Sequence, residues 1–264
     1  MSFQYKHVLL VGATSGIGAS MAAHLVNAGV KVTAVGRRKE RLDEFVSKHG
    51  EEKASSAVFD ITKLDKIPAF AEGIIKAHPT IDCIFLNAGI QRRHTFAAPS
   101  SVDLDSFNGE ITTNFISFVH LTHAFLPFLL AKESATGLVY TGSHISLVPA
   151  FSLPAYSASK AALDAFVVCM REQLKSSSVK VMDISAPPVQ TELHDFESGP
   201  EAGKAFGMPA DQFTEEAYKE LMAGTENIVI GEVGGSTKEQ FLEIAERRMA
   251  AVQRLSQLIR AHHS

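Results

Sequence analysis

The sequence predicts an α/β fold, namely a doubly wound, Rossmann-type parallel sheet of about seven strands with helices on both faces. Short, continuously apolar runs alternate with segments of helical period along the chain, which is typical of strands buried on both faces of a parallel sheet. The first apolar run ends in a glycine-rich turn that opens a helical segment. No linker rich in Pro, Gly or Ser divides the sheet, so we expect a single domain over residues 1–264.

The expected strands cover residues 7–11, 30–35, 55–59, 81–86, 137–142, 179–184 and 227–231. Between them we expect helices at 16–28, 39–48, 64–77, 104–131, 155–175 and 214–223, and this alternation implies right-handed crossovers. Residues 186–213 hold four prolines and three glycines without a steady period. A segment of that length in a compact domain is usually a binding loop, so we interpret it as a substrate lid.

A C-terminal amphipathic helix is expected over residues 237–261. Its apolar stripe must be covered, either by the chain's own core or by a second subunit, and the sequence leaves both open.

Composition disfavours several classes of protein. A net charge of −4 argues against a nucleic-acid binder. The apolar runs are shorter than a membrane span, and the first strand begins too early for a signal peptide, so we expect a cytoplasmic protein with no membrane partner. Cys83 and Cys169 lie in apolar segments, and we interpret both as buried free thiols. His120 and His123 lack acidic or cysteine partners at ligand spacing, so no metal site is expected.

The turn after the first strand, Gly12-Ala13-Thr14-Ser15-Gly16-Ile17-Gly18, predicts a dinucleotide site. Glycines there let the backbone approach a pyrophosphate, which the N–H groups and the dipole of the helix N-terminus stabilise. We expect the cofactor to contact Gly12, Thr14, Ser15 and Ile17. No Gly-Lys-Ser/Thr follows, which disfavours a P-loop phosphotransferase.

Further candidates for cofactor binding stand where later strands end. Arg37 and Arg38 follow the second strand, and guanidinium groups there suit the 2′-phosphate of NADP; alternatively, both arginines simply form the solvated start of the next helix. Asp60 follows the third strand, at a position suited to an adenine amino group, and Asn87 and Gly89 follow the fourth. All of them fall at the carboxyl edge of the sheet, where doubly wound folds bind ligands.

Tyr156 and Lys160 are four residues apart at the start of an expected helix, so they lie one turn apart on one face. A nearby ammonium can lower the pKa of a phenol, and such a pair can then move a proton at neutral pH. Taken alone, the spacing is a weak signal, because Tyr and Lys at this spacing are commonly a surface pair without chemistry.

Read together, the Gly12–Gly18 turn, Asn87-Ala88-Gly89, Asn114, Ser143 and Tyr156-x-x-x-Lys160 resemble the short-chain dehydrogenases/reductases of the short, single-domain type. The resemblance covers roughly residues 5–235, and Ser143 lies thirteen residues before Tyr156, the spacing that this family uses. The tail and the segment APPVQTEL are similar to the DltE-like branch.

The resemblance implies a role for each catalytic residue. Tyr156 would be the general acid in carbonyl reduction, and Lys160 would lower the phenol pKa and bind the nicotinamide ribose. Ser143 would donate a hydrogen bond to the substrate oxygen. Asn114 would hold a water that relays protons; the alternative is that an Asn inside a helix satisfies buried backbone groups.

One segment departs from the family pattern. Where the family usually has Pro-Gly after the sixth strand, this chain has Ala186-Pro187 followed by Pro188. Proline fixes φ and removes an N–H, so the loop over the nicotinamide must take another path. We still expect Val189 and Thr191 to contact the cofactor.

The expected activity is that of an NADP(H)-dependent oxidoreductase that interconverts a carbonyl and an alcohol, acting as a reductase. The alternatives are a non-catalytic dinucleotide-binding regulator or scaffold, and an epimerase of the same fold. The resemblance also implies a homodimer or homotetramer, with the helices at 104–131 and 155–175 as candidate interfaces. A small-molecule substrate with an apolar portion is expected from the candidate substrate-facing residues His144, Ile145, Leu147, Phe151, Phe196, Phe206 and Met208.

Overall fold

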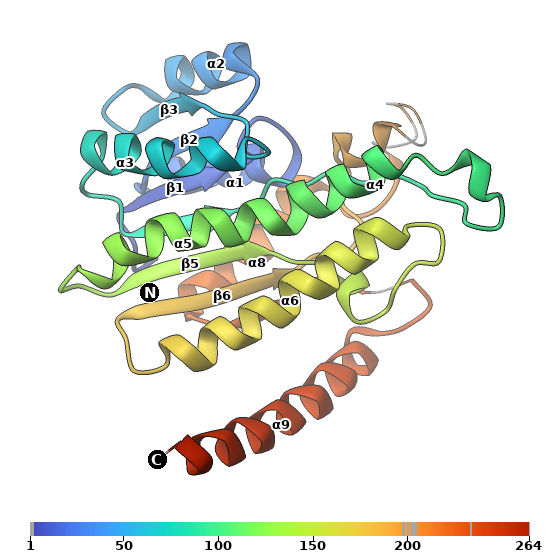
Figure 1. The fold of residues 1–264 in the computed structure, drawn as a ribbon. Helices are drawn as coiled ribbons and strands as arrows, with labels where there is room; N and C mark the ends of the chain where they lie inside the picture. Colours follow the sequence, from blue (N-terminus) through green and yellow to red (C-terminus); the bar gives the residue numbers. More distant parts are fainter. Residues whose placement is uncertain (1–2, 197–198, 200, 202–204, 233, 264) are drawn as a thin grey trace.

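The computed structural model describes residues 3–196, 199, 201, 205–232 and 234–263, which are built around one parallel sheet of seven strands (Figure 1). The strand order is β3-β2-β1-β4-β5-β6-β7. The chain adds β2 and β3 on one side of β1 and then crosses to add β4 to β7 on its other side, so the switch point of the topology lies between β1 and β4. A crevice at such a switch point is the usual ligand site of this architecture. The strands are β1 (His7–Val11), β2 (Lys31–Gly36), β3 (Ala54–Val58), β4 (Cys83–Leu86), β5 (Thr136–Thr141), β6 (Val179–Ser185) and β7 (Asn227–Val229).

Helices cover both faces of the sheet, as the apolar strands require. One face carries α1 (Gly16–Asn27), α2 (Lys39–His49) and α8 (Ala210–Ala223), and the other carries α3 (Ile67–Ala77), α5 (Ser117–Leu130) and α6 (Pro154–Leu174). Side chains alternate between the two cores along β1, since Val8 and Leu10 pack on the first face and Leu9 and Val11 on the second. The predicted fold class is confirmed.

The helix expected at 104–131 is broken in its middle. It consists of α4 (Leu104–Ile111), a wide π-helical turn at Thr112–Ile116, and α5. Single π-helical turns inside α-helices are frequently found at functional sites, and this one holds Asn114. By length and composition the stretch Leu104–Leu130 could cross a membrane, but it packs along the sheet here as a core helix, with Phe118, Leu121 and Phe125 buried.

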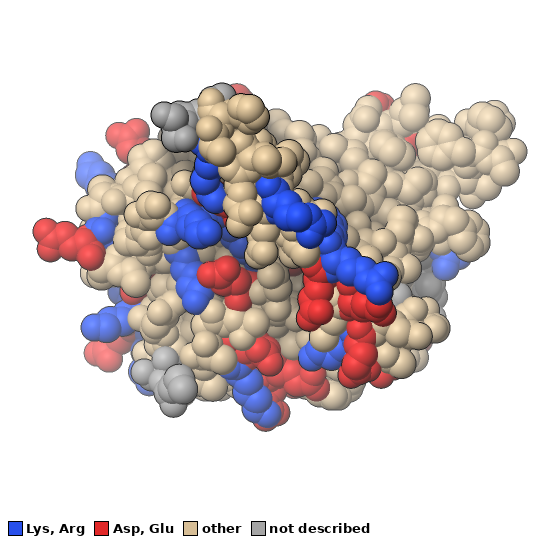
Figure 2. Space-filling model, turned by 90° about the horizontal axis from the view of Figure 1, so that it is seen from below, with Lys and Arg blue, Asp and Glu red and all other residues tan. Residues whose placement is uncertain are grey.

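The last helix, α9 (Lys238–His263), lies alongside α6 (Figure 1). Two ion pairs connect the helices, Arg248 with Asp164 and Arg260 with Glu172. Phe241 near its start is only 3% exposed, so this end of the apolar stripe packs on the chain itself. Further along, the stripe is open to solvent at Ile244, Leu255, Leu258 and Ile259. The side of the molecule on which α9 lies carries basic and acidic side chains intermixed (Figure 2).

Two expectations about single segments are wrong. Cys83 is buried, whereas Cys169 is exposed, because Val167 and Met170 are the residues of this turn of α6 that pack in the core against the sheet. The helix expected from Thr214 begins at Ala210, directly after Pro209, so the segment interpreted as a lid ends in helical structure.

Candidate active site

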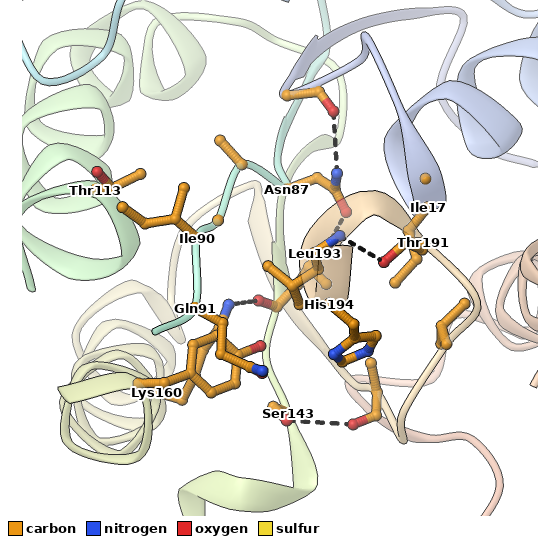
Figure 3. A pocket seen from close by; sticks show the side chains of 18 of the residues that line it. Ile17, Asn87, Ile90, Gln91, Thr113, Ser143, Lys160, Thr191, Leu193 and His194 are labelled. Carbon is orange, nitrogen blue, oxygen red and sulfur yellow. Dashed lines mark hydrogen bonds between the residues drawn. The ribbon is translucent and has the colours of Figure 1, made fainter. Parts of the chain in front are cut away.

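A cavity of about 1030 Å³ opens at the carboxyl edge of the sheet, between the segments that follow β1, β2, β3, β4, β5 and β6. Figure 3 shows Ser143 and Lys160 in the lower part of the view of this cavity. Asn87, Ile17 and Thr191 lie in the upper and right part of the same view. Asn114 does not line the cavity, although its neighbour Thr113 does. The residues predicted to bind cofactor all line it, namely Gly12, Thr14, Ser15, Ile17, Arg37, Arg38, Asp60, Asn87, Gly89, Tyr156, Lys160, Val189 and Thr191.

The glycine-rich turn after β1 needs its glycines for two reasons. Gly12 has φ of +87°, and a Cβ there would lie 2.5 Å from the backbone nitrogen of Ala88 on the neighbouring strand end. Gly16 has φ of +52°, and a Cβ there would lie 2.8 Å from the Thr191 methyl group. Both positions therefore exclude a side chain, which leaves the turn as a bare backbone surface at the start of α1.

The arginines after β2 are held against this turn. Arg38 donates hydrogen bonds to the hydroxyls of Thr14, at 3.1 and 3.0 Å, and Ser15, at 2.5 Å. It also pairs with Glu192 at 2.5 Å, and Arg41 pairs with the other oxygen of that carboxylate at 2.6 Å. Burial acts to raise the pKa of Glu192, but the hydrogen bonds from both arginines outweigh it and lower the pKa.

Glu192 and Arg41 are participants that sequence reasoning missed. Arg41 could have been suspected, because it lies in the first turn of α2, which directly follows Arg37 and Arg38. Nothing in the sequence indicates Glu192, which reaches the turn only through the path of the loop after β6.

Asp60, at the end of β3, accepts hydrogen bonds from the Thr62 N–H at 3.0 Å and the Thr62 hydroxyl at 2.8 Å. Burial acts to raise its pKa, but these bonds and the charge of Arg37 lower it on balance. The side chain is therefore a fixed carboxylate at the same end of the cavity as the arginines.

Tyr156 and Lys160 are brought together as the helical spacing predicts. The Lys160 ammonium lies 5.7 Å from the centre of the Tyr156 ring and donates a 2.7 Å hydrogen bond to the Thr141 carbonyl at the end of β5. Both side chains are buried, with Tyr156 8% and Lys160 2% exposed. Ser143, two residues beyond β5, donates a 3.3 Å hydrogen bond to the Ala186 carbonyl, and it lies close enough to the phenol to act on its pKa.

The expected lowering of the phenol pKa is not found. Burial raises the pKa of Tyr156 to about 12; the hydrogen bond with Ser143 lowers it, and the charge of Glu110 raises it further. Burial also lowers the pKa of Lys160 to about 8, against the attraction of Asp183. The prediction of a depressed phenol pKa is wrong because removal from water favours the neutral form of each group.

Asn114 satisfies buried backbone groups. Its amide nitrogen donates to the Ile90 carbonyl at 2.8 Å and the Ser159 hydroxyl at 3.1 Å, and its oxygen accepts from the Ile90 N–H at 2.9 Å. Asn114 thus has the role that was the alternative to a proton relay, since it satisfies backbone groups inside the protein. Its bond to Ser159 also connects the segment after β4 to α6. Its role in a proton relay stays a prediction.

Two carboxyl groups act on the Tyr156–Lys160 pair, the half-buried Asp183 and the fully buried Glu110, and nothing in the sequence pattern indicated either. Burial raises the pKa of Asp183 on β6 to about 7, although Arg171 and Lys160 attract its charge. One of its oxygens is buried without a hydrogen-bond partner. Glu110 on α4 is fully buried and bonded to His94 at 2.8 Å, and burial raises its pKa as well.

The loop with Pro187 and Pro188 does take its own path. The Pro188 carbonyl accepts from the Met208 N–H at 2.9 Å, and the Gln190 N–H donates to the Met208 carbonyl at 2.9 Å. These two bonds close the neck of the segment between residues 190 and 207. Val189 and Thr191 line the cavity, as predicted.

His144 is a packing residue at the edge of this site. Its ring is 3% exposed and stacks on Phe241 of α9, with ring centres 4.6 Å apart. Burial lowers its pKa to about 4, so it is neutral at physiological pH. Among the candidate substrate-facing residues, His144, Ile145, Phe196 and Phe206 line the cavity. The other three candidates, Leu147, Phe151 and Met208, do not line it: Phe151 is 99% exposed and Met208 packs on the core beside Val189.

Comparison with known proteins places this geometry among relatives. A family model described as short chain dehydrogenase matches residues 6–201. The uncharacterised oxidoreductase DltE of Bacillus subtilis (strain 168) is 29% identical over 235 residues, which cover 89% of this chain and 92% of that protein. This similarity agrees with the branch that the C-terminal part of the sequence indicated.

Two solved structures share the fold. A short chain dehydrogenase/reductase from Burkholderia phymatum in complex with NAD has a TM-score of 0.78 at 18% identity, covering 87% of this chain and 90% of that one. A short chain dehydrogenase from Burkholderia cenocepacia J2315 in complex with NADP has a TM-score of 0.75 at 23% identity, covering 97% of both chains.

Proposed function

The chain belongs to the short-chain dehydrogenase family, and from that membership we propose that it is an NADP(H)-dependent oxidoreductase that interconverts a carbonyl and an alcohol, acting as a reductase. The observation that carries the proposal is the meeting of Tyr156, Lys160 and Ser143 in one cavity with the glycine-rich turn. A nicotinamide cofactor supplies or accepts the hydride when it is bound.

The residues present fit such a cofactor. Gly12 and Gly16 leave no room for side chains beside the start of α1, which suits a pyrophosphate. Arg37 and Arg38 would hold the 2′-phosphate of NADP, and Asp60 would face the adenine end. Val189 and Thr191 would contact the nicotinamide end, and the Lys160 ammonium would bind its ribose.

Tyr156 is suited to donate a proton. With a pKa of about 12 the phenol stays protonated at neutral pH, as a group must that gives its proton to a developing alkoxide. Ser143 acts on the same oxygen site and would donate a hydrogen bond to the substrate oxygen as negative charge grows there. These properties support the reductive direction.

The direct test is a Tyr156→Phe variant assayed for NADPH consumption with a panel of aldehydes and ketones. Turnover should fall by a factor of about 100 or more, while NADPH binding is kept. Tyr218→Phe, on α8 away from the cavity, is the matched control and should behave as the wild type. Unchanged turnover in Tyr156→Phe would remove the proposed acid. Tight NADPH binding by the wild type with no hydride transfer to any compound would instead indicate a dinucleotide-binding scaffold.

We also propose a homo-oligomer in the cytoplasm. The outward side of α5 exposes Leu130, and the open part of the α9 stripe exposes Leu255 and Leu258, which supports association. Sedimentation velocity on the full chain would show a dimer or tetramer, and a monomer at micromolar concentration would contradict this proposal.

A further inference from the structure

The segment after β4 forms one wall of the cavity and is rigidly held. Asn114 binds both backbone groups of Ile90, as described above. Four residues further on, His94 bonds to the buried Glu110 of α4 at 2.8 Å. The segment is therefore held on both sides of Arg92, at Ile90 by the π-helical turn and at His94 by α4.

The guanidinium group of Arg92 is held as well. It donates a 2.5 Å hydrogen bond to the Gln91 carbonyl, and its central carbon lies 3.7 Å above the centre of the Phe196 ring. Stacking occupies one face of the planar group and leaves its edge available for hydrogen bonds. Phe196 belongs to the segment interpreted as the lid and is 70% exposed, so it steadies Arg92 without enclosing it.

The charges that line the cavity are unevenly distributed. Of the lining residues that the structure describes, the acidic ones are Asp60 and Glu192, and both lie at the end where Arg37 and Arg38 stand. The part lined by Ser143, Tyr156 and the segment after β4 contains the Lys160 ammonium and the neighbouring Arg92 and Arg93, and no carboxylate faces it among the described lining residues. A negatively charged ligand is favoured there, since its charge meets cations only.

We propose that the substrate of this enzyme is an aldehyde or ketone that also carries an oxyanion group, a carboxylate in the first place, and that Arg92 binds this group. The inference rests on the proposed function and specifies the substrate class of that same site. A planar guanidinium with a free edge binds a carboxylate through two parallel hydrogen bonds, which would fix the orientation of the carbonyl toward Tyr156. The apolar rings of Phe196 and Phe206 line the cavity beside it and suit the carbon chain between the two groups.

The test compares matched pairs of substrates with NADPH. Each pair consists of an ω-oxo acid, such as succinic semialdehyde, and the neutral aldehyde of similar length, such as butanal. The wild type should favour the charged member in kcat/KM by about ten-fold or more. Arg92→Gln should lose this preference through a higher KM, with the neutral aldehydes unaffected, and Arg92→Lys should keep part of it. Arg254→Gln, at an exposed arginine on α9 that does not line the cavity, is the control and should keep the preference.

A binding measurement keeps this inference separate from the proposed function. Titration of succinate, which has no reactive carbonyl, into the NADPH-loaded protein should give calorimetric binding that Arg92→Gln loses and Arg254→Gln keeps. Equal kcat/KM for charged and neutral aldehydes, unchanged in Arg92→Gln, would overturn the inference while leaving the oxidoreductase intact. If no aldehyde of either series is reduced, the proposed function fails. In that case, succinate binding by the wild type that is lost in Arg92→Gln would still support an oxyanion site at Arg92.

Discussion

Asp183 lies behind the catalytic pair, and its replacement by Asn gives a test of how burial controls the site. The carboxyl group stands on β6 against Gly142, where a Cβ would lie 2.6 Å from one of its oxygens. That oxygen is buried and has no hydrogen-bond partner among the described residues. Lys160 and Arg171 attract the charge without binding it directly, so the ionised form is poorly compensated.

The magnitude follows from the pKa. Burial raises the pKa of Asp183 from 3.8 to about 7. A difference of about three units corresponds to at most about 4 kcal/mol of preference for the neutral form. The pKa of Asp183 is higher in the folded chain than in the unfolded chain. The free energy of unfolding therefore contains the full contribution of this carboxyl group below pH 4, and that contribution is lost as the pH rises through 7. Asn, which stays neutral, should not show this loss.

Asp183→Asn should therefore be more stable than the wild type at pH 8, by up to about 4 kcal/mol, and equal to it near pH 4. Urea denaturation at pH 4.5, 6 and 8 measures the difference, and Asp211→Asn, at an exposed acid on α8, is the control with no such trend. The same change removes the charge that raises the Lys160 pKa, so NADPH affinity should fall at a lower pH than in the wild type. An Asn variant that is less stable than the wild type at pH 8 would refute the reasoning.

Three other predictions follow from the contacts around the cavity. Because burial lowers the pKa of Lys160 to about 8, NADPH should bind the wild type more weakly at pH 9 than at pH 7, and fluorescence titrations that show constant affinity would contradict a charged Lys160 at the ribose. Glu192→Gln releases Arg38 and should tighten NADPH binding about two- to five-fold, as expected for half-exposed ion pairs, with NADH unchanged; an equal change for both cofactors would count against the 2′-phosphate site. Phe241→Ala should lower the free energy of unfolding by about 3 kcal/mol, because it removes a buried ring. It should also reduce kcat more than NADPH affinity, because the ring packs on His144 beside Ser143. Leu258→Ala, on the exposed part of α9, should leave stability, kcat and NADPH affinity unchanged.

Much of the site could be predicted because the fold repeats one unit. Residues that directly follow parallel strands all arrive at one edge of the sheet, so Gly12, Asp60, Asn87 and Ser143 could be placed together from sequence position alone. The helical period fixed Lys160 relative to the phenol in the same way.

The parts that escaped prediction depend on loop paths and on burial. Glu192 meets Arg38 across 154 positions of sequence, through a loop that has no periodic pattern. Glu110 looks like an ordinary polar helix residue until the π-helical turn and the segment after β4 enclose it. The exposure of Cys169 could not be read from FVVCM, since apolar residues occur on both sides of that turn of α6.

Glu110 and Asp183 bear on the protonation state of the Tyr156–Lys160 pair. Glu110 acts on Tyr156 and raises the pKa of the phenol, and Asp183 acts on Lys160 and opposes the lowering of the ammonium pKa by burial. Each acid therefore helps to keep a proton on the group beside it, and a protonated phenol next to a charged lysine is the state from which a carbonyl oxygen can be protonated. Oxidation of an alcohol requires the opposite state, in which the phenolate accepts the proton. Since carboxyl groups at both ends of the pair act against that state, they are consistent with the proposed function as a reductase.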